Sequence, residues 1–315
     1  MKRPLASQRK EYGRALVEIG EMRPDVVVLD ADLSTSTRTA EFAKKFPHRF
    51  FNCGIAEQNM MGTAAGLAAS GKIVFASSFA VFATGRCWDQ IRQSIAYTKF
   101  NVKIVATHAG ITVGGDGASH QTAEDIALMR TLPNMTIVVP ADAPETYKAI
   151  KAVVDWPGPC YVRLGRVDFP VVTTPETPFS IGKATEMLPG DDVTVIATGQ
   201  MVAVALDAAE ELKRMGISAS VINMSTIKPL DEETIIRCAQ KTGAIVTAEE
   251  HNILSGLGSA VATCLCENYP VPMKRVGIPD TFGESGESEE LMVKYGLTSD
   301  EIVKAAMEVI RRKRK

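Results

Sequence analysis

The alternation of strands and helices is clearest in residues 73–105, which read IVFASSFAVFATGRCWDQIRQSIAYTKFNVKIV. The stretch begins with the apolar run Ile73–Phe75 and ends with the run Val102–Val105, and both have the residue types that favour β-strands. Between them, residues 82–97 have a helical pattern. A strand, a helix and a second strand in this order are typical of an α/β fold with a mostly parallel sheet.

The same alternation continues on both sides of this stretch. In the first half of the chain it predicts further strands at 26–29, 136–139 and 161–162, and further helices near 6–19, 57–69, 122–130 and 143–155. In the second half it predicts strands at 193–196, 218–222, 244–247 and 273–276, and helices near 201–215, 231–241, 256–268 and 299–312. We therefore expect two successive α/β series.

The pattern breaks once between the two series. Residues 169–178 contain three prolines and no periodicity, which is typical of an extended linker. A length of 315 residues also exceeds what one hydrophobic core usually serves. The sequence predicts a first domain over 1–170, a linker over 171–182 and a second domain over 183–315.

The composition excludes several classes of protein. Hydrophobic residues make up 45% of the chain and charged residues 23%, with a net charge of −2, so an intrinsically disordered chain is excluded. This charge gives no electrostatic reason to bind nucleic acid or an anionic membrane, and we interpret the basic run 311–315 as a solvated helix end. No apolar run is long enough to span a bilayer, and the N-terminus lacks a signal sequence pattern. Six scattered cysteines without a C-x-x-C pair favour buried free thiols in a reducing cytoplasm.

One carboxylate stands out in the stretch NCGIAEQNMMG, residues 52–62. Glu57 precedes a run of small and apolar residues that ends at residue 69, so it lies at the start of a predicted helix. It is either a first-turn acid that interacts with the helix dipole or a desolvated acid that shares a proton with a heterocycle nitrogen. The residues alone leave both interpretations open.

Two further segments could carry a site. Phe79 and Phe82 follow a strand and could form the wall of a flat pocket, although such a pair is more often part of the core. Residues 107–121 also follow a strand, are rich in glycine, and contain His108, Asp116 and His120. Loops at the carboxyl ends of parallel strands are where α/β proteins place their sites, so we interpret this long loop as functional.

The motifs at 54–59 (GIAEQN) and 116–121 (DGASHQ) together resemble those of the transketolases. The resemblance runs from about residue 5 to the C-terminus and includes the motifs at 31–33, 132–134, 249–251 and 282–286. It covers the pyrimidine-binding and C-terminal domains of that family but not its diphosphate-binding domain. Gly115–Gly117 is similar to the start of the family's metal motif, but the asparagine that should follow is absent near 141–147.

This partial coverage implies the C-terminal subunit of a two-subunit transketolase. The implied partner is an N-terminal subunit that carries the diphosphate-binding domain, in an α2β2 assembly. The implied cofactor is thiamine diphosphate, with Mg²⁺ or Ca²⁺ held mainly by the partner and no metal ligand in this chain. The implied reaction transfers a two-carbon ketol unit from a ketose phosphate to an aldose phosphate.

The resemblance also implies roles for individual residues. It implies that Glu57 hydrogen-bonds N1′ of the aminopyrimidine and that Glu57 and His120 are catalytic. The implied cofactor contacts are Glu57, Phe79, Phe82 and Asp32. The implied substrate contacts are Asp116 and His120 near the reacting carbon, and Arg9, Ser36, His108 and Arg166 at the sugar phosphate. The resemblance leaves two assignments open. Arg163 is an alternative to Arg166 as a ligand of the sugar phosphate, and Gly85 stands where the family often has a tyrosine in the wall of the ring pocket.

Three alternatives compete with this interpretation. The β subunit of a 2-oxo-acid dehydrogenase and a 1-deoxyxylulose-5-phosphate synthase-like enzyme have similar chemistry, but residues 31–33, Ser36 and residues 282–286 resemble transketolase instead. A non-catalytic subunit of the same fold is the third. Glu57, His120 and Arg166 argue against it, because a site without turnover has no chemical need for them.

Overall fold

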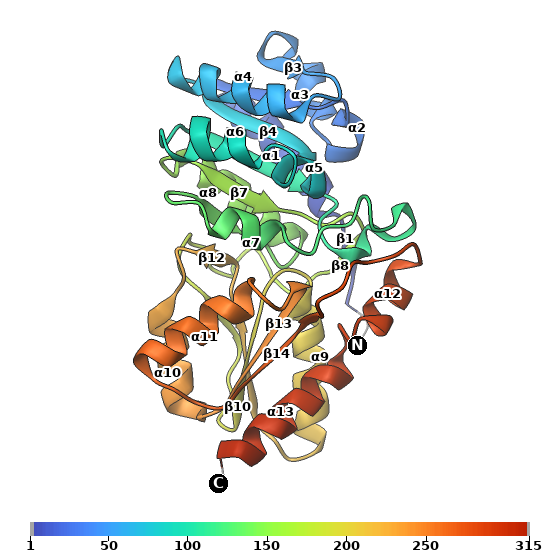
Figure 1. Cartoon of the computed structure of the whole chain (residues 1–315), viewed down its shortest axis with the longest axis vertical. Helices are drawn as coiled ribbons and strands as arrows, with labels where there is room; N and C mark the ends of the chain where they lie inside the picture. Colours follow the sequence, from blue (N-terminus) through green and yellow to red (C-terminus); the bar gives the residue numbers. More distant parts are fainter. Residues whose placement is uncertain (1–2, 314–315) are drawn as a thin grey trace.

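The structure is a computed structural model that describes residues 3–313, and it has two lobes that lie one above the other in Figure 1. The upper lobe contains a seven-stranded sheet with the strand order β12-β6-β7-β5-β4-β2-β3. All neighbouring strands in it are parallel except β12, which is antiparallel to β6. Its strands are β2 (Val26–Asp30), β3 (Phe50–Asn52), β4 (Ile73–Phe79), β5 (Val102–Thr107), β6 (Thr136–Val138), β7 (Cys160–Arg163) and β12 (Thr226–Lys228).

Helices cover both faces of this sheet. Two helices, α1 (Gln8–Met22) and α8 (Ala143–Asp155), pack together and bury side chains such as Tyr12 and Val153 against one face. Ser7 caps α1 by accepting a hydrogen bond from Lys10 N, and such a cap satisfies a free amide at the helix start. The other face is covered by α4 (Glu57–Ala69), α5 (Ala80–Thr84), α6 (Trp88–Gln90), a π-helical turn (Ile91–Ala96) and α7 (Asp125–Arg130).

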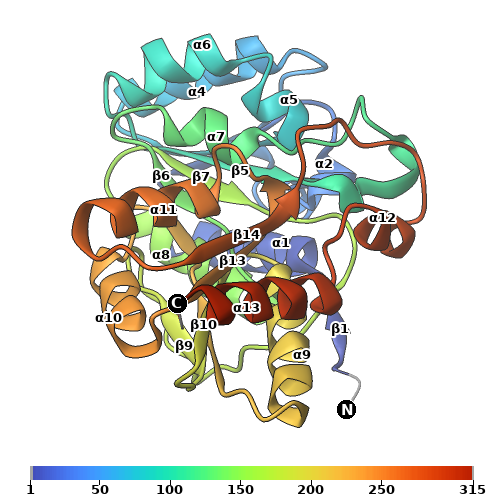
Figure 2. The same ribbon diagram turned by 60° about the horizontal axis from the view of Figure 1, so that its bottom comes forward.

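The lower lobe contains a five-stranded sheet with the order β14-β13-β10-β11-β9. Only β9 is antiparallel to its neighbour. Figure 2 shows α13 crossing in front of β10, β13 and β14. The elements of this lobe are β9 (Thr185–Leu188), β10 (Val193–Ala197), α9 (Met201–Arg214), β11 (Ala219–Asn223), α10 (Glu232–Thr242), β13 (Ile245–Asn252), α11 (Leu257–Asn268), β14 (Met273–Ile278), α12 (Ser288–Lys294) and α13 (Ser299–Lys313).

The two lobes are tied together by strands and by core packing. Thr226 of β12 comes from the second half of the chain but pairs with Val138 of the first sheet. The linker is held on the first lobe, where β1 (Leu5–Ala6) pairs with β8 (Phe169–Pro170) and the amides of Val172 and Thr173 donate to the Asp142 carboxylate. One apolar core cluster also includes residues of both halves. The lobes therefore cannot separate without breaking backbone pairing and buried contacts.

Most of the predicted elements are confirmed, and α4 and α8 have the predicted limits. The single helix predicted at 82–97 is wrong, because α5 ends at Thr84 and two short segments follow it. The helix predicted at 122–130 begins only at Asp125. The missed elements are short: β1, α2 (Ser34–Thr37), α3 (Ala40–Lys45), a 3₁₀ turn (Pro47–Arg49), β3, a 3₁₀ segment (Ile111–Asp116), β8, β9, β12 and α12.

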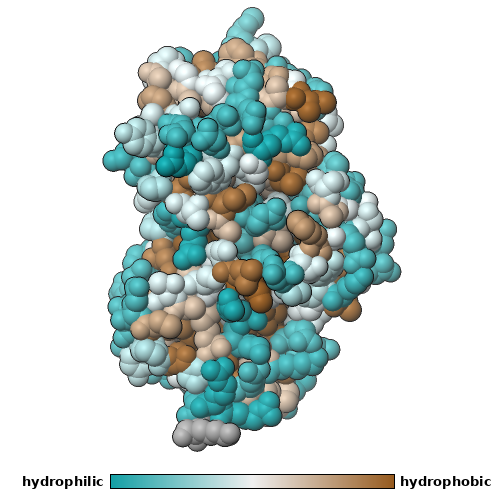
Figure 3. All heavy atoms as spheres, viewed as in Figure 1, coloured by the Kyte–Doolittle hydropathy of each residue, from teal (hydrophilic) through white to brown (hydrophobic). Residues whose placement is uncertain are grey.

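All six cysteines lie among the described residues and are free, and four of them are buried. The prediction of buried thiols is wrong for Cys266, which is exposed, and Cys53 is only partly buried. In the basic run, Arg311 and Arg312 are exposed on α13, while residues 314 and 315 lie outside the described residues. Within residues 3–313, no helix combines the length and the hydropathy that a membrane span requires. Figure 3 shows a face on which hydrophilic residues cover both lobes and apolar residues form small separate groups.

Candidate functional site at the carboxyl edge of the first sheet

The carboxyl ends of β2, β4, β5 and β7 lie along one edge of the first sheet, since these four strands are parallel neighbours. The predicted site residues lie at the ends of these strands or follow them, except Glu57 and Arg9, which stand at the starts of α4 and α1. Crossover helices run antiparallel to the strands, so their first turns point to the same edge. The topology thus gathers segments that are far apart in the sequence.

Glu57 is buried at this edge, with a side chain that is only 3% exposed. Its Oε2 atom accepts a hydrogen bond from Arg86 Nη1 at 3.1 Å. Arg86 lies just after α5, and its guanidinium carbon is 4.3 Å from the centroid of the Phe82 ring. Gln58 Nε2 donates to the Arg86 carbonyl at 2.7 Å, which holds the backbone of this segment against α4. A buried acid, an arginine and an aromatic ring therefore meet in one place.

Four of the predicted residues form a continuous set of aromatic contacts. The rings of Phe79 and Phe82 are nearly parallel, at 15°, with centroids 5.9 Å apart. His108 stacks on Phe79 at 3.7 Å, and His120 meets the Phe82 ring edge-on at 5.3 Å. Phe79 is buried, but Phe82 and His120 are only partly buried. The two phenylalanines are therefore not both part of the hydrophobic core. The set can hold a flat heterocyclic ring on one side and a polar substrate beside the two histidines.

The glycine-rich loop that carries Asp116 and His120 is held by a segment of the second lobe. Gln121 Nε2 donates to the Glu284 carbonyl at 2.8 Å. A side chain at Gly117, where φ is +74°, would lie 2.5 Å from Ser285 Oγ, so only glycine fits this contact. Asp116 itself is exposed. The motif at 282–286 thus positions the loop rather than lying apart from it.

A cluster of basic side chains lies near His108. Arg9 Nη1 donates to the Ser36 carbonyl at 3.0 Å, and the Nε atoms of Arg9 and Arg38 are buried and have no hydrogen-bond partner among the residues that the structure describes. Burial, followed by the charges of Arg38 and Arg166, lowers the pKa of Arg9. Burial, then Arg9, Arg166 and His120, lowers the pKa of His108 to about 3, so this imidazole is neutral at physiological pH. Positive charge gathers here with unused donors, which suits an anion.

Asp32 and Gly85 lie at the margins of this arrangement. Asp32 is exposed, has φ of +64°, and accepts a hydrogen bond from Asn52 Nδ2 at 3.0 Å. The two hydrogen bonds between Asp32 and Asn52 join only these residues to each other and do not reach the aromatic residues of the site. Gly85 is exposed between α5 and α6, where an added Cβ would meet only the Val81 carbonyl, at 3.2 Å. The wall beside Phe82 is therefore open at this position.

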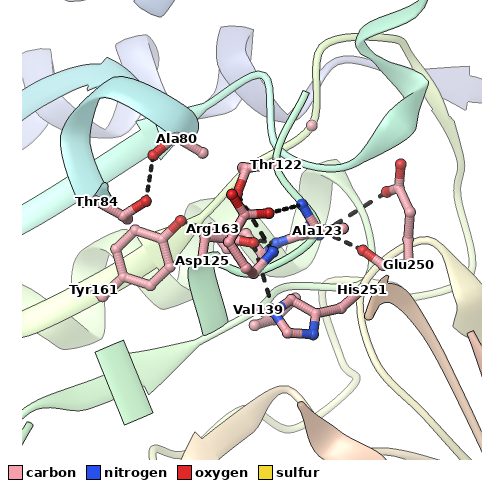
Figure 4. A network of polar contacts seen from close by, with 12 residues as sticks. Ala80, Thr84, Thr122, Ala123, Asp125, Val139, Tyr161, Arg163, Glu250 and His251 are labelled. Carbon is pink, nitrogen blue, oxygen red and sulfur yellow. Dashed lines mark hydrogen bonds and ion pairs between the residues drawn. The ribbon is translucent and has the colours of Figure 1, made fainter. Parts of the chain in front are cut away.

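The structure gives the two candidate arginines different surroundings. Arg163 is 7% exposed and buried between the lobes, where Nε donates to Asp125 Oδ2 at 2.8 Å and Nη2 donates to the Glu250 carbonyl at 2.9 Å (Figure 4). Tyr161 and His251 complete this network around Asp125. Arg166 is only partly buried and donates to the Val113 carbonyl near the glycine-rich loop. Arg166, not Arg163, belongs to the basic cluster.

Sequence reasoning missed Arg86, Arg38 and Asn52. The only sequence signal for Arg86 was its spacing, because it lies four residues after Phe82 within the helix predicted at 82–97. Arg38 and Asn52 gave no such signal. Arg38 follows the four-residue helix α2, and Asn52 ends the three-residue strand β3. Neither segment is long enough to show periodicity.

Comparisons with known proteins agree with this arrangement. The family profile described as "Transketolase, pyrimidine binding domain" matches residues 6–171, and "Transketolase, C-terminal domain" matches residues 182–302. A putative transketolase C-terminal section from Methanocaldococcus jannaschii is 52% identical, over 96% of both chains. The 6-deoxy-6-sulfo-D-fructose transketolase subunit SqwH from a Clostridium species is 46% identical, over 97% of this chain and 95% of its own length. One of the subunits of an apulose-4-phosphate transketolase from Phocaeicola vulgatus is 42% identical, over 96% of this chain and 97% of its own length.

Solved structures show the same similarity. One described as "Split gene transketolase, inactive beta4 tetramer" matches with a TM-score of 0.92 and 53% identity, over 98% of this chain and 99% of that chain. The transketolase of Leishmania mexicana matches with a TM-score of 0.82 and 25% identity. This chain covers 99% of its own length there but only 46% of that longer chain.

Proposed function

The chain belongs to the transketolase family, as the C-terminal subunit of a split transketolase, and on that basis we propose that it transfers a two-carbon ketol unit between sugar phosphates. The bond between C2 and C3 of a ketose phosphate breaks, and the unit is passed to the aldehyde carbon of an aldose phosphate. The observation that carries this proposal is the meeting of buried Glu57, the Phe79–Phe82 wall and the basic cluster along one edge of the sheet.

The residues at this edge fit the pyrimidine part of thiamine diphosphate, the cofactor of this family. Phe82 offers a partly exposed aromatic face for a flat ring, and Glu57 offers a buried carboxylate within reach of a ring nitrogen. Among residues 3–313, no group of three or more His, Cys, Asp or Glu side chains is arranged to hold a metal ion. We propose that the diphosphate and its Mg²⁺ or Ca²⁺ are held mainly by a partner subunit.

Each of the site residues then has a defined task. When bound, thiamine diphosphate supplies the carbon nucleophile that takes up the two-carbon unit. Glu57 holds a shared proton at N1′, and its burial excludes water that would compete for that proton. His120 lies edge-on to Phe82 and binds a hydroxyl near the reacting carbon. The remaining roles proposed are Phe79 and Asp32 at the cofactor, Asp116 at a substrate hydroxyl, and Arg9, Ser36, His108 and Arg166 at the terminal phosphate.

We propose that this edge is also where an N-terminal subunit docks, in an α2β2 assembly. Ile55 lies two residues before Glu57 and is 79% exposed, and Phe282, in the segment that holds the glycine-rich loop, is 83% exposed. Large apolar side chains exposed beside a site are typical of a surface that a partner covers. The cytoplasmic location expected from the sequence stays a prediction.

We expect the purified chain alone to have no transketolase activity and to bind thiamine diphosphate weakly. Without metal ligands from a partner, the charge of the diphosphate is poorly compensated. The measurement is turnover of a ketose phosphate and an aldose phosphate by the chain alone and by the complex with the subunit that copurifies with it. Turnover by the chain alone at high purity would overturn the split-subunit proposal. Decarboxylation of pyruvate by the complex would instead favour a 2-oxo-acid dehydrogenase or a 1-deoxyxylulose-5-phosphate synthase.

Arg166→Ala should selectively weaken the use of phosphorylated donors. A charge-assisted hydrogen bond contributes about 1.5–3 kcal/mol, so kcat/KM for a ketose phosphate should fall about 10- to 150-fold. Hydroxypyruvate lacks the phosphate and should be nearly unaffected. The measurement is kcat/KM of the complex with both donors, together with a melting curve.

The control for this prediction is the contact between Arg166 and the Val113 carbonyl. If that contact is the only role of Arg166, both donors should lose activity equally and the melting temperature should fall. Arg163→Ala is not a suitable matched variant, because it breaks the buried network between the lobes. Arg49→Ala is a better control, since Arg49 bonds backbone carbonyls far from the basic cluster.

A further inference from the structure

Arg86 makes two contacts at once, and both are with residues of the cofactor site. Its Nη1 atom donates to Glu57 Oε2 at 3.1 Å, and its guanidinium carbon lies 4.3 Å from the centroid of the Phe82 ring. The side chain of Arg86 is 47% exposed, while that of Glu57 is 3% exposed. Arg86 therefore reaches inward from solvent to a buried acid, with its flat end on an aromatic face.

These contacts are the same two that the proposed function assigns to the aminopyrimidine ring. A guanidinium group is planar, carries N–H donors in its plane and stacks on aromatic faces. An aminopyrimidine that stacks on Phe82 and shares a proton with Glu57 through N1′ is also flat and uses the same face and the same carboxylate. Such a ring needs both the face and the acceptor atom that Arg86 uses.

We propose that Arg86 is a displaceable stand-in for the pyrimidine ring of the cofactor. It occupies Phe82 and Glu57 while no cofactor is bound, and it turns outward when the ring enters. This inference rests on the proposed function, since it assumes that the ring binds at Phe82 and Glu57. Cofactor binding is then a competition, in which the ring must replace the chain's own arginine.

The surroundings of Arg86 support an exchange of this kind. A buried carboxylate without a partner is strongly unfavourable, so Glu57 gains from a donor that is present whenever the ring is not. The exposed side of Arg86 gives the guanidinium a route to solvent. The Gln58 side chain holds the Arg86 carbonyl, so the side chain can turn while the backbone stays in place. The segment continues into a π-helical turn, Ile91–Ala96, an irregularity that is frequent near functional sites.

The test is a titration of thiamine diphosphate with Mg²⁺ into the complex with the copurifying subunit, followed by calorimetry. Arg86→Ala removes the competitor, so the dissociation constant should fall about 3- to 30-fold, the range expected for a partly exposed ion pair together with a cation–π contact. Arg86→Lys keeps the charge but loses the flat group, so its affinity should lie between those of the wild type and the alanine variant. Arg92→Ala is the matched control, because Arg92 is an exposed arginine in the following turn, and it should bind as the wild type does.

Other outcomes separate this inference from the proposed function. Weaker or unchanged binding by Arg86→Ala, with normal binding by the wild type, would overturn the stand-in role and show that Arg86 supports the bound ring or is indifferent to it. Failure of every variant and of the wild type to bind thiamine diphosphate would overturn the proposed function itself. If the alanine variant does not fold, the lysine variant decides, because tighter binding than the wild type is expected of it as well.

Discussion

Glu57→Gln should lower kcat of the complex by at least about 10²-fold and leave the fold unchanged. Glutamine has nearly the same shape and can still form hydrogen bonds through its amide, but it cannot share a proton with a ring nitrogen. The side chain is buried at the start of α4, so water cannot take over this task. The measurements are kcat and the rate of C2–H/D exchange of the bound cofactor.

A matched control for this variant is Glu232→Gln. Glu232 is also the first residue of a helix, α10, but it is exposed and lies in the other lobe. It shares with Glu57 any favourable interaction with the helix dipole. Equal and small effects of both substitutions would mean that Glu57 is only a first-turn acid. Near-normal C2–H/D exchange in Glu57→Gln would contradict the catalytic assignment directly.

Arg163→Met should destabilise the folded chain by about 3–5 kcal/mol, because it leaves the Asp125 carboxylate buried without its charged partner. Asp125 is fully buried, and Arg163 is its ion-pair partner at 2.8 Å. Burial raises the pKa of Asp125, but Arg163 and then His251 outweigh it, so the net pKa lies below the ordinary value of 3.8. The carboxylate is therefore charged in the folded protein. The measurement is urea or thermal unfolding of the variant.

Two further variants test the cause of this loss. Arg14→Met removes an exposed arginine that pairs with Glu11 and Glu18, and it should change stability by about 1 kcal/mol or less. Asp125→Asn added to Arg163→Met removes the unpaired charge and should recover part of the loss. A phosphate-binding role for Arg163 would appear as selective loss of activity with phosphorylated donors in folded protein, which we do not expect.

The helices and strands that the sequence predicted correctly are those whose apolar residues recur with a clear periodicity. Helices α4 and α8 each extend over thirteen residues, and the buried strands between them are rich in β-branched residues. Periodicity failed at residues 82–97, because apolar spacing does not show that Gly85 ends one helix and a π-helical turn follows. It also failed at β12, whose three residues pair with a strand about ninety positions earlier in the chain. The proposed domain limits at 171–182 depend on the same local signals.

The candidate site could be predicted only in part for a related reason. Glu57, Phe79, Phe82, His108 and His120 lie in segments that follow clear strands or begin clear helices, so their motifs point to one edge of a parallel sheet. The contacts between them depend on tertiary structure. No sequence pattern indicates that Arg86 reaches Glu57, or that Arg163 pairs with Asp125 rather than facing a substrate.

Because β12 pairs with β6, the first sheet cannot be completed until the ribosome has synthesised part of the second half of the chain. The last strand that the first half contributes to the first sheet, β7, ends at residue 163, and β12 ends at residue 228, so 65 further residues must be synthesised before this sheet is complete. At about 5–20 residues per second, that interval lasts roughly 3–13 s. During it, β6 is an open edge strand that other chains can pair with. A nascent chain stalled between residues 163 and 228 should therefore depend on chaperones more than the finished protein does.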